Sequence, residues 1–311
     1  MSVLVTGGNG SIGSMVCHEL LRRGETVIAF DASPSTFGTP AWTSVQGDVL
    51  DAAGLREAIR HHKADRVVHL AVVLPTQEQH QPRRAFEVNT IGTLNLIEAC
   101  LAEGVRRLVF TSSKGALGII DPPHAPPEFA PVDETYRRRP VLIYDISKAA
   151  CEDLLAYYRR YQGLDYVTLR FPTLYGPDRL ARHGDLALVS KILEGARAGV
   201  PVSVAAEGWA DELLYTGDVA RAIVLALACE EPGQRMYHIG TGVVSSLADV
   251  IDAVRELYPN ADIQVKAGTP RDNRACRFDI GRARSELGWQ PRYDLRGGLR
   301  AYGEILGEEP R

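Results

Sequence analysis

Short apolar runs, rich in β-branched residues, alternate with amphipathic stretches through the first 170 residues of the chain. The apolar runs predict strands at 3–6, 26–30, 43–46, 66–70, 107–111 and 166–170. The stretches between them predict helices at 12–23, 55–61, 86–103 and 146–161. Because the strands are nearly continuous in apolar residues and alternate with helices, they predict an α/β fold with a doubly wound parallel sheet.

After residue 170 the alternation becomes less regular. Helices are predicted at 186–198, 219–228, 247–257 and 282–287, separated by turns that contain glycine and proline. The segment 213–239 has the pattern of strand, helix and strand, and we expect it to return to the main sheet. Five prolines within 121–131 predict a stiff surface loop.

Composition narrows the class of protein. The formal net charge is −4, which gives no electrostatic reason to expect nucleic acid or an anionic membrane as a partner. No apolar run reaches membrane-spanning length and no charged leader precedes the first strand, so a cytoplasmic protein is expected. The five cysteines form no CxxC pair, and we expect neither disulfides nor a metal site.

A glycine-rich turn follows the first predicted strand directly, with the sequence Thr6-Gly7-Gly8-Asn9-Gly10-Ser11-Ile12-Gly13. Gly7 permits a sharp turn, Gly10 lets the backbone approach a pyrophosphate, and Gly13 lets the next helix pack closely on the sheet. The amides at the helix start face the anion. An ordinary tight turn is the alternative, and the position directly after the first strand argues against it.

Asp31 ends the second predicted strand, 18 residues beyond Gly13. A carboxylate there accepts hydrogen bonds from both ribose hydroxyls and repels a 2′-phosphate, so NAD is favoured over NADP. Asp48 either meets the adenine amino group or caps the helix near Leu55. We therefore predict a dinucleotide-binding (Rossmann) domain at 1–172, joined by 213–239, and a smaller, discontinuous substrate-binding domain at 173–311.

Tyr144 and Lys148 lie four residues apart at the start of a predicted helix and therefore share one face of it. A tyrosine has an ordinary pKa near 10, and a neighbouring cation favours the phenolate, which then serves as a base. Ser113 or Ser112, at the end of the fifth predicted strand, can hold the substrate oxygen in line with the phenol. For Ser112 a hydroxyl that caps a turn is the alternative.

Together these motifs resemble the extended short-chain dehydrogenase/reductase family, the group that includes NAD-dependent sugar-nucleotide epimerases and dehydratases. The resemblance covers nearly the whole chain and includes TGGxGxIG at 6–13, GDV at 47–49, HLA at 69–71, FTSS at 110–113, YxxSK at 144–148, RFPTLYGP at 170–177, GDVARA at 217–222 and ELGWQP at 286–291. It implies that Tyr144 is the base, that Lys148 holds Tyr144 and the nicotinamide ribose, and that Ser113 orients the substrate. The predicted cofactor-binding residues are Gly7, Asn9, Gly10, Ser11, Ile12, Gly13, Asp31, Asp48, Val49, Leu70, Ala71, Asn89, Thr111, Tyr144, Lys148, Phe171 and Thr173.

The chain departs from its relatives where nucleotide-sugar enzymes hold the substrate diphosphate. Thr173 stands where they carry an asparagine, and Asp211 stands where they carry an arginine. The charge reversal at Asp211 disfavours a diphosphate. Arg182, Arg271 and Arg274 are candidates to hold a substrate anion, with solvated surface arginines as the alternative.

Three functions remain open. The leading hypothesis is an NAD-dependent dehydrogenase that oxidises a secondary alcohol of a small polar substrate, such as a sugar, sugar acid or hydroxy acid. The alternative is an epimerase that oxidises its sugar substrate transiently. A non-enzymatic cofactor-sensing scaffold is the third, and retention of both Tyr144 and Lys148 argues against it. The family resemblance also implies a homodimer through the helices predicted at 86–103 and 146–161.

Overall fold

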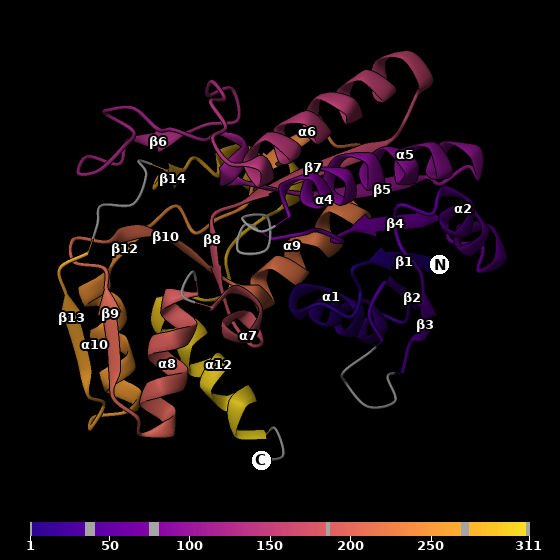
Figure 1. Cartoon of the computed structure of the whole chain (residues 1–311). Helices are drawn as coiled ribbons and strands as arrows, with labels where there is room; N and C mark the ends of the chain where they lie inside the picture. The colour runs from indigo at the N-terminus through magenta and orange to yellow at the C-terminus, as the bar shows by residue number, and fades with distance from the viewer. Residues whose placement is uncertain (1, 35–40, 75–80, 185–186, 269–273, 309–311) are drawn as a thin grey trace.

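The computed structural model describes residues 2–34, 41–74, 81–184, 187–268 and 274–308. Its largest element is a seven-stranded sheet with the strand order β11-β7-β5-β4-β1-β2-β3, in which every neighbouring pair is parallel (Figure 1). The chain winds from β1 to β3 in one direction and from β4 to β11 in the other. The doubly wound α/β fold predicted from the sequence is confirmed.

The elements of this part of the chain carry the following bounds. The strands of the main sheet are β1 (Ser2–Thr6), β2 (Thr26–Asp31), β3 (Thr43–Gln46), β4 (Arg66–His69), β5 (Arg107–Ser113), β7 (Tyr166–Phe171) and β11 (Met236–His238). The helices are α1 (Ser11–Arg22), α2 (Ala52–His61), α4 (Pro82–Phe86), α5 (Gly92–Ala102), α6 (Ile143–Gln162), α9 (Thr216–Ala228) and α11 (Gly281–Leu287), with a 3-10 turn η2 (Lys114–Ala116).

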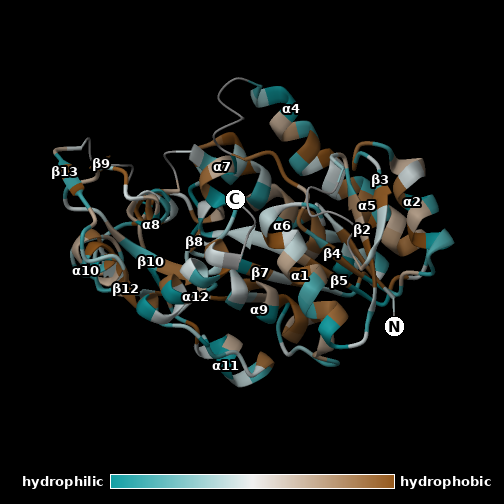
Figure 2. Cartoon of the chain, turned by 90° about the horizontal axis from the view of Figure 1, so that it is seen from below, coloured by the Kyte–Doolittle hydropathy of each residue, from teal (hydrophilic) through white to brown (hydrophobic). Residues whose placement is uncertain are grey.

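Side chains of alternate sheet residues enter two separate cores because successive residues of a strand point to opposite faces. Val3 and Val5 pack with α1 and α9, whereas Leu4, between them, packs with α2, α5 and α6. Figure 2 shows α1 and α9 along the near side of the strands. A sheet covered on both faces leaves the ends of its strands as the place for a site.

The remaining elements build a smaller unit beside the carboxyl ends of the strands (Figure 1). It contains a three-stranded sheet in the order β12-β10-β8 and a two-stranded sheet of β13 and β9. Its elements are β8 (Thr173–Tyr175), α7 (Arg179–His183), α8 (Leu188–Ala198), β9 (Val202–Ala205), β10 (Ala210–Tyr215), β12 (Val244–Ser246), α10 (Leu247–Leu257), β13 (Ile263–Lys266) and α12 (Leu295–Glu308). A further short pair joins β6 (Pro131–Val132) to β14 (Arg277–Phe278).

Some elements differ from those the sequence predicts. The helix predicted at 86–103 is divided: α4 passes through a π-helical turn, η1 (Glu87–Ile91), into α5. The segment predicted as strand, helix and strand at 213–239 is shared between sheets, because β10 lies in the smaller sheet and β11 in the main one. The sequence pattern also failed to predict α12, whose Gly297–Gly298 pair weakens the helical signal. The division into domains at 172/173 stays a prediction.

Among the described residues, no helix is both long and apolar enough to cross a membrane. The five cysteines are free, and the described residues contain no cluster of side chains suited to a metal ion.

A buried ion pair joins α6, the helix that carries the Tyr–Lys pair, to the sheet. Glu152 of α6 accepts hydrogen bonds from both Arg170 Nε (2.7 Å) and Nη2 (2.6 Å), and the two side chains are 1% and 2% exposed. Glu152 also accepts a hydrogen bond from Ser112 Oγ at 2.7 Å. One carboxylate therefore fixes α6 against β5 and β7.

We expect Glu152→Ala to lower the free energy of unfolding by about 3–5 kcal/mol, because it leaves the Arg170 guanidinium buried without its partner. Chemical denaturation followed by circular dichroism measures this change. Asp153→Ala is the matched control, since Asp153 pairs with Arg138 from a side chain that is 68% exposed, and its loss should cost less than about 1 kcal/mol. Equal effects of the two substitutions would contradict the assignment.

Candidate active site

A cavity of about 1250 Å³ lies between the carboxyl ends of the main-sheet strands and the smaller unit. It opens where the winding direction of the sheet reverses, between β1 and β4. Open α/β sheets bind their ligands at this switch point, outside the ends of the strands.

The glycine-rich turn forms one end of the cavity. Gly7 has a φ of 69°, and a Cβ on it would lie 2.7 Å from the Ala71 nitrogen. A Cβ on Gly13 would lie 2.1 Å from the Gly7 carbonyl oxygen, so α1 can approach the turn only with glycine there. The N-cap residue Gly10 makes no side-chain cap, and the first turn of α1 carries no acidic residue. Its amides therefore remain for an anion, which fits the pyrophosphate of a dinucleotide.

Asp31 lies at the adjoining end of β2 and lines the cavity. Its Oδ2 accepts a hydrogen bond from the Asn9 amide (3.0 Å) and its Oδ1 from the Ser33 amide (2.9 Å). Each carboxylate oxygen keeps a lone pair for a ribose hydroxyl. Asn9 itself braces the turn, donating from Nδ2 to the Ser33 carbonyl at 2.7 Å, and does not line the cavity.

Most predicted cofactor residues lie on the cavity wall, and Asn9 and Asn89 do not. The residues on the wall are Gly7, Gly10, Ser11, Ile12, Gly13, Asp31, Asp48, Val49, Leu70, Ala71, Thr111, Tyr144, Lys148, Phe171 and Thr173. Asn89 lies behind the wall in the π-helical turn, where it pairs with both backbone groups of Val73 and donates to Ser147 Oγ at 3.2 Å. It thus fixes the loop after β4 to α6. Asp48 is paired with Arg84 at 2.7 Å.

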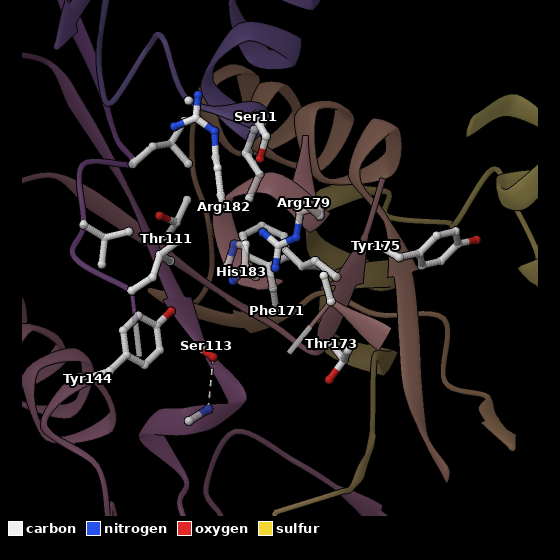
Figure 3. A pocket seen from close by; sticks show the side chains of 18 of the residues that line it. Ser11, Thr111, Ser113, Tyr144, Phe171, Thr173, Tyr175, Arg179, Arg182 and His183 are labelled. Carbon is white, nitrogen blue, oxygen red and sulfur yellow. Dashed lines mark hydrogen bonds between the residues drawn. The ribbon is translucent and has the colours of Figure 1, made fainter. Parts of the chain in front are cut away.

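Tyr144 and Lys148 enter the cavity from the first turns of α6. The Lys148 Nζ lies 5.8 Å from the centroid of the Tyr144 ring and donates a hydrogen bond to the Thr111 carbonyl at 2.7 Å. Burial lowers the pKa of Lys148 to about 8, so the ammonium form still predominates at neutral pH. Figure 3 shows the Tyr144 phenol at one side of the cavity, with Ser113 nearby in the view.

The two serines at the end of β5 have different surroundings. Ser113 Oγ accepts a hydrogen bond from the Gly115 amide at 3.1 Å, so its own proton is still available to a substrate oxygen. Ser112 donates its proton to the buried Glu152. This contact favours Ser113 over Ser112 as the donor to the substrate oxygen, and the role of either serine stays a prediction.

An ion pair without net charge lies on the part of the cavity wall formed by β8, β10 and the turn after β5. Asp211 of β10 pairs with Lys114 and accepts a hydrogen bond from Thr173 Oγ1 at 2.6 Å. All three residues line the cavity. The two departures noted in the sequence, Thr173 and Asp211, therefore contact each other, and Lys114 balances the carboxylate charge.

The predicted substrate arginines lie in different places. Arg182 donates to the Asn9 carbonyl at 3.2 Å, next to the glycine-rich turn, and Arg274 pairs with Asp145 at 3.0 Å. Arg271 lies outside the described residues. The sequence pattern did not predict Arg179, which lines the cavity from α7 together with His183 (Figure 3). A basic residue two positions after the YGP motif was the available signal for Arg179.

The cavity combines a dinucleotide-binding turn at the switch point of the sheet with a Tyr–Lys pair. This combination is typical of NAD-dependent enzymes that transfer hydride. The sequence model of the NAD dependent epimerase/dehydratase family matches residues 3–240. The chain belongs to this family, and it takes a small-molecule substrate.

Individual relatives extend over the whole chain. It is 31% identical over 311 residues to UDP-glucose 4-epimerase of Mycolicibacterium smegmatis, with 96% of each chain covered. Its structure is similar to that of UDP-glucose 4-epimerase from Thermus thermophilus in complex with NAD, with 32% identity, a TM-score of 0.87 and both chains fully covered. The Thermotoga maritima UDP-glucose 4-epimerase with UDP-glucose gives 28% identity and a TM-score of 0.88, with 99% of each chain covered.

These comparisons confirm the predicted family, the enzyme class and the NAD cofactor. The names of the relatives match the epimerase alternative better than the dehydrogenase hypothesis.

We expect Asp31→Ala to weaken NAD binding about tenfold or more and to reduce the preference for NAD over NADP, because the substitution removes the acceptor for both ribose hydroxyls and the charge that repels a 2′-phosphate. Calorimetric titration with each cofactor measures both quantities, and NADP serves as the internal control. An unchanged ratio of the two dissociation constants would remove Asp31 from this role.

Proposed function

We propose that the chain is an NAD-dependent dehydrogenase that oxidises a secondary alcohol of a small polar substrate, such as a sugar, sugar acid or hydroxy acid. The observation that carries the proposal is that Tyr144, Lys148 and Ser113 share the cavity with the neutral Lys114–Asp211 pair. The first three residues supply the chemistry of alcohol oxidation. The family resemblance implies that Asp211 stands where nucleotide-sugar enzymes carry an arginine that holds the diphosphate.

In the proposed mechanism, Ser113 donates a hydrogen bond to the substrate oxygen and Tyr144 removes the hydroxyl proton as general base. The Lys148 ammonium favours the phenolate form of Tyr144 electrostatically. Its hydrogen bond to the Thr111 carbonyl holds the ammonium at the end of β5. When bound, NAD accepts the hydride from the carbinol carbon. The reverse proton transfer from Tyr144 reduces a ketone.

The polar wall supports a substrate without a diphosphate. A diphosphate carries at least two negative charges and needs cationic or amide donors. The Lys114 charge is already balanced by Asp211, and the Thr173 proton is used by the same carboxylate. A neutral hydroxyl-bearing substrate meets this wall with a smaller desolvation cost.

An epimerase is the second candidate, because relatives that match the full length carry that name. Its reaction would use Tyr144 and Lys148 in the same roles, with the hydride returned to the opposite face of the ketone. A nucleotide-sugar epimerase would have to separate Asp211 from Lys114 or bind the diphosphate elsewhere. A cofactor-sensing scaffold is less well supported, since both residues that move the proton are present.

We also propose a homodimer through α5 and α6. Tyr157 and Tyr161 of α6 are 55% and 61% exposed, and Ile91, just before α5, is 41% exposed. Large exposed side chains grouped on neighbouring helices favour a protein contact. Nucleic acid and membranes are not expected as partners, and a cytoplasmic location stays a prediction.

We expect Tyr144→Phe to lower kcat by at least about 100-fold, since it removes the general base and leaves the ring in place. The dissociation constant for NAD, measured by calorimetry, should change less than about threefold, which separates loss of chemistry from loss of the fold. The absorbance of NADH reports the turnover. Substantial residual activity with intact NAD binding would rule out the mechanism.

Cofactor retention distinguishes the two candidate reactions. We expect a dehydrogenase to lose NAD on dialysis and to accumulate NADH in proportion to substrate over many turnovers. An epimerase would retain NAD and show no net NADH while the substrate changes configuration. The assay uses polyols, sugar acids and hydroxy acids, with UDP-glucose as the expected negative. Epimerisation of UDP-glucose without NADH release would replace the dehydrogenase proposal.

A further inference from the structure

Six strongly basic side chains line the cavity, and five of them have a polar partner in the described residues. Arg84 pairs with Asp48, Lys114 with Asp211 and Arg274 with Asp145, while Lys148 donates to the Thr111 carbonyl and Arg182 to the Asn9 carbonyl. The sixth is Arg179, the first residue of α7.

The Arg179 guanidinium makes no ion pair with the part of the chain that the structure describes. Its Nε atom is fully covered and has no hydrogen-bond partner there. Burial lowers the pKa of Arg179 to about 10, so the side chain stays charged at neutral pH. Arg179 is half-buried as a whole, so its guanidinium has lost part of its water and gains no counter-ion from the described residues, which favours an anion beside it.

Arg179 directly follows Asp178, the N-cap residue of α7, which has a φ of 63°. Figure 3 shows Arg179 beside Phe171 in the view, with Tyr144 on the other side of the cavity.

The two arginines of α7 face different parts of the cavity. Arg182 contacts the glycine-rich turn, where the cofactor pyrophosphate is expected. Arg179 and Tyr144 line the same cavity. We expect an anion bound by Arg179 to lie between these two side chains, on the substrate side.

We propose that Arg179 binds a carboxylate of the substrate, so that the enzyme oxidises hydroxy acids or sugar acids in preference to neutral polyols. The inference rests on the proposed function and names the substrate class for the same site. The carboxylate accepts hydrogen bonds from the two terminal nitrogens in a bidentate geometry, because protein atoms cover Nε. The bound acid supplies the counter-ion that the described residues do not provide.

The test compares acids with neutral molecules of the same carbon skeleton: gluconate with sorbitol, glucuronate with glucose, and glycerate with glycerol. Binding is measured by calorimetry to the NAD-loaded Tyr144→Phe protein, in which turnover is blocked, with and without Arg179→Met. We expect the best acid to bind at least about tenfold more tightly than its neutral partner, and Arg179→Met to weaken that acid about 10- to 100-fold while leaving the neutral partner unchanged.

Two further variants show whether the guanidinium fork of Arg179, rather than any cation on α7, recognises the acid. Arg179→Lys, which keeps the charge and loses the fork, should recover part of the acid affinity. Arg182→Met, on the same helix, should leave the ratio of acid to neutral affinity unchanged. If Arg179→Met raises the dissociation constant for NAD by the same factor as it lowers acid affinity, Arg179 binds the pyrophosphate instead. That result would overturn the proposal.

The outcomes also distinguish the role of Arg179 from the dehydrogenase reaction itself. Equal binding of acids and neutral partners overturns the role of Arg179, even where wild-type protein oxidises alcohols. Failure of the wild type to oxidise any alcohol in the panel counts against the dehydrogenase proposal. Binding of an acid that depends on Arg179 would still support the anion site in that case.

Discussion

The close approach of α1 to the turn that leaves β1 is the constraint on which the site depends. No side chain fits at Gly13, because its Cβ would lie 2.1 Å from the Gly7 oxygen. The contact brings the uncapped amides of α1 to the point where the sheet reverses direction. An anion bound there gains both the amide hydrogen bonds and the favourable end of the helix dipole. The backbone therefore fixes the expected position of the cofactor pyrophosphate. Side chains such as Asp31 affect only the preference for one cofactor over another.

The second requirement is a fixed distance between α6 and the strand ends, and buried polar groups supply it. Glu152 joins α6 to Arg170 of β7 and to Ser112 of β5, while Asn89 joins the loop after β4 to Ser147 of α6. Because such groups are costly to bury unpaired, each makes only one arrangement of strand and helix favourable. Tyr144 and Lys148 are at the cavity end of the helix so fixed. The positions of Tyr144 and Lys148 in the proposed catalytic pair thus depend on buried contacts behind the cavity wall.

The sequence predicts the main sheet and the glycine-rich turn well because both depend on local patterns. Apolar runs form strands, and the Gly7–Gly13 spacing fits one type of turn. Periodicity does not predict the π-helical turn within 86–103, in which Asn89 contacts the backbone of Val73, 16 residues away. The use of Ser112 by Glu152, 40 residues away, is likewise a tertiary contact. Arg179 was missed for the same reason: its position after the YGP motif marks it, but only the fold shows that it has no carboxylate partner among the described residues.

The distribution of charge in the cavity follows from these contacts and limits the substrate. An unpaired Asp211 would repel an anion from this part of the cavity wall. An unpaired Lys114 would attract one. Paired, they nearly cancel, and the hydrogen bond from Thr173 completes the polar contacts of the carboxylate. Two further cations line the cavity, the buried Lys148 and the half-buried Arg179, and both act in surroundings less polar than water. Two such cations favour both a phenolate at Tyr144 and one further negative charge beside it. In the proposed site a monoanionic acid would supply that charge, whereas a neutral polyol would leave Arg179 without a counter-ion among the described residues.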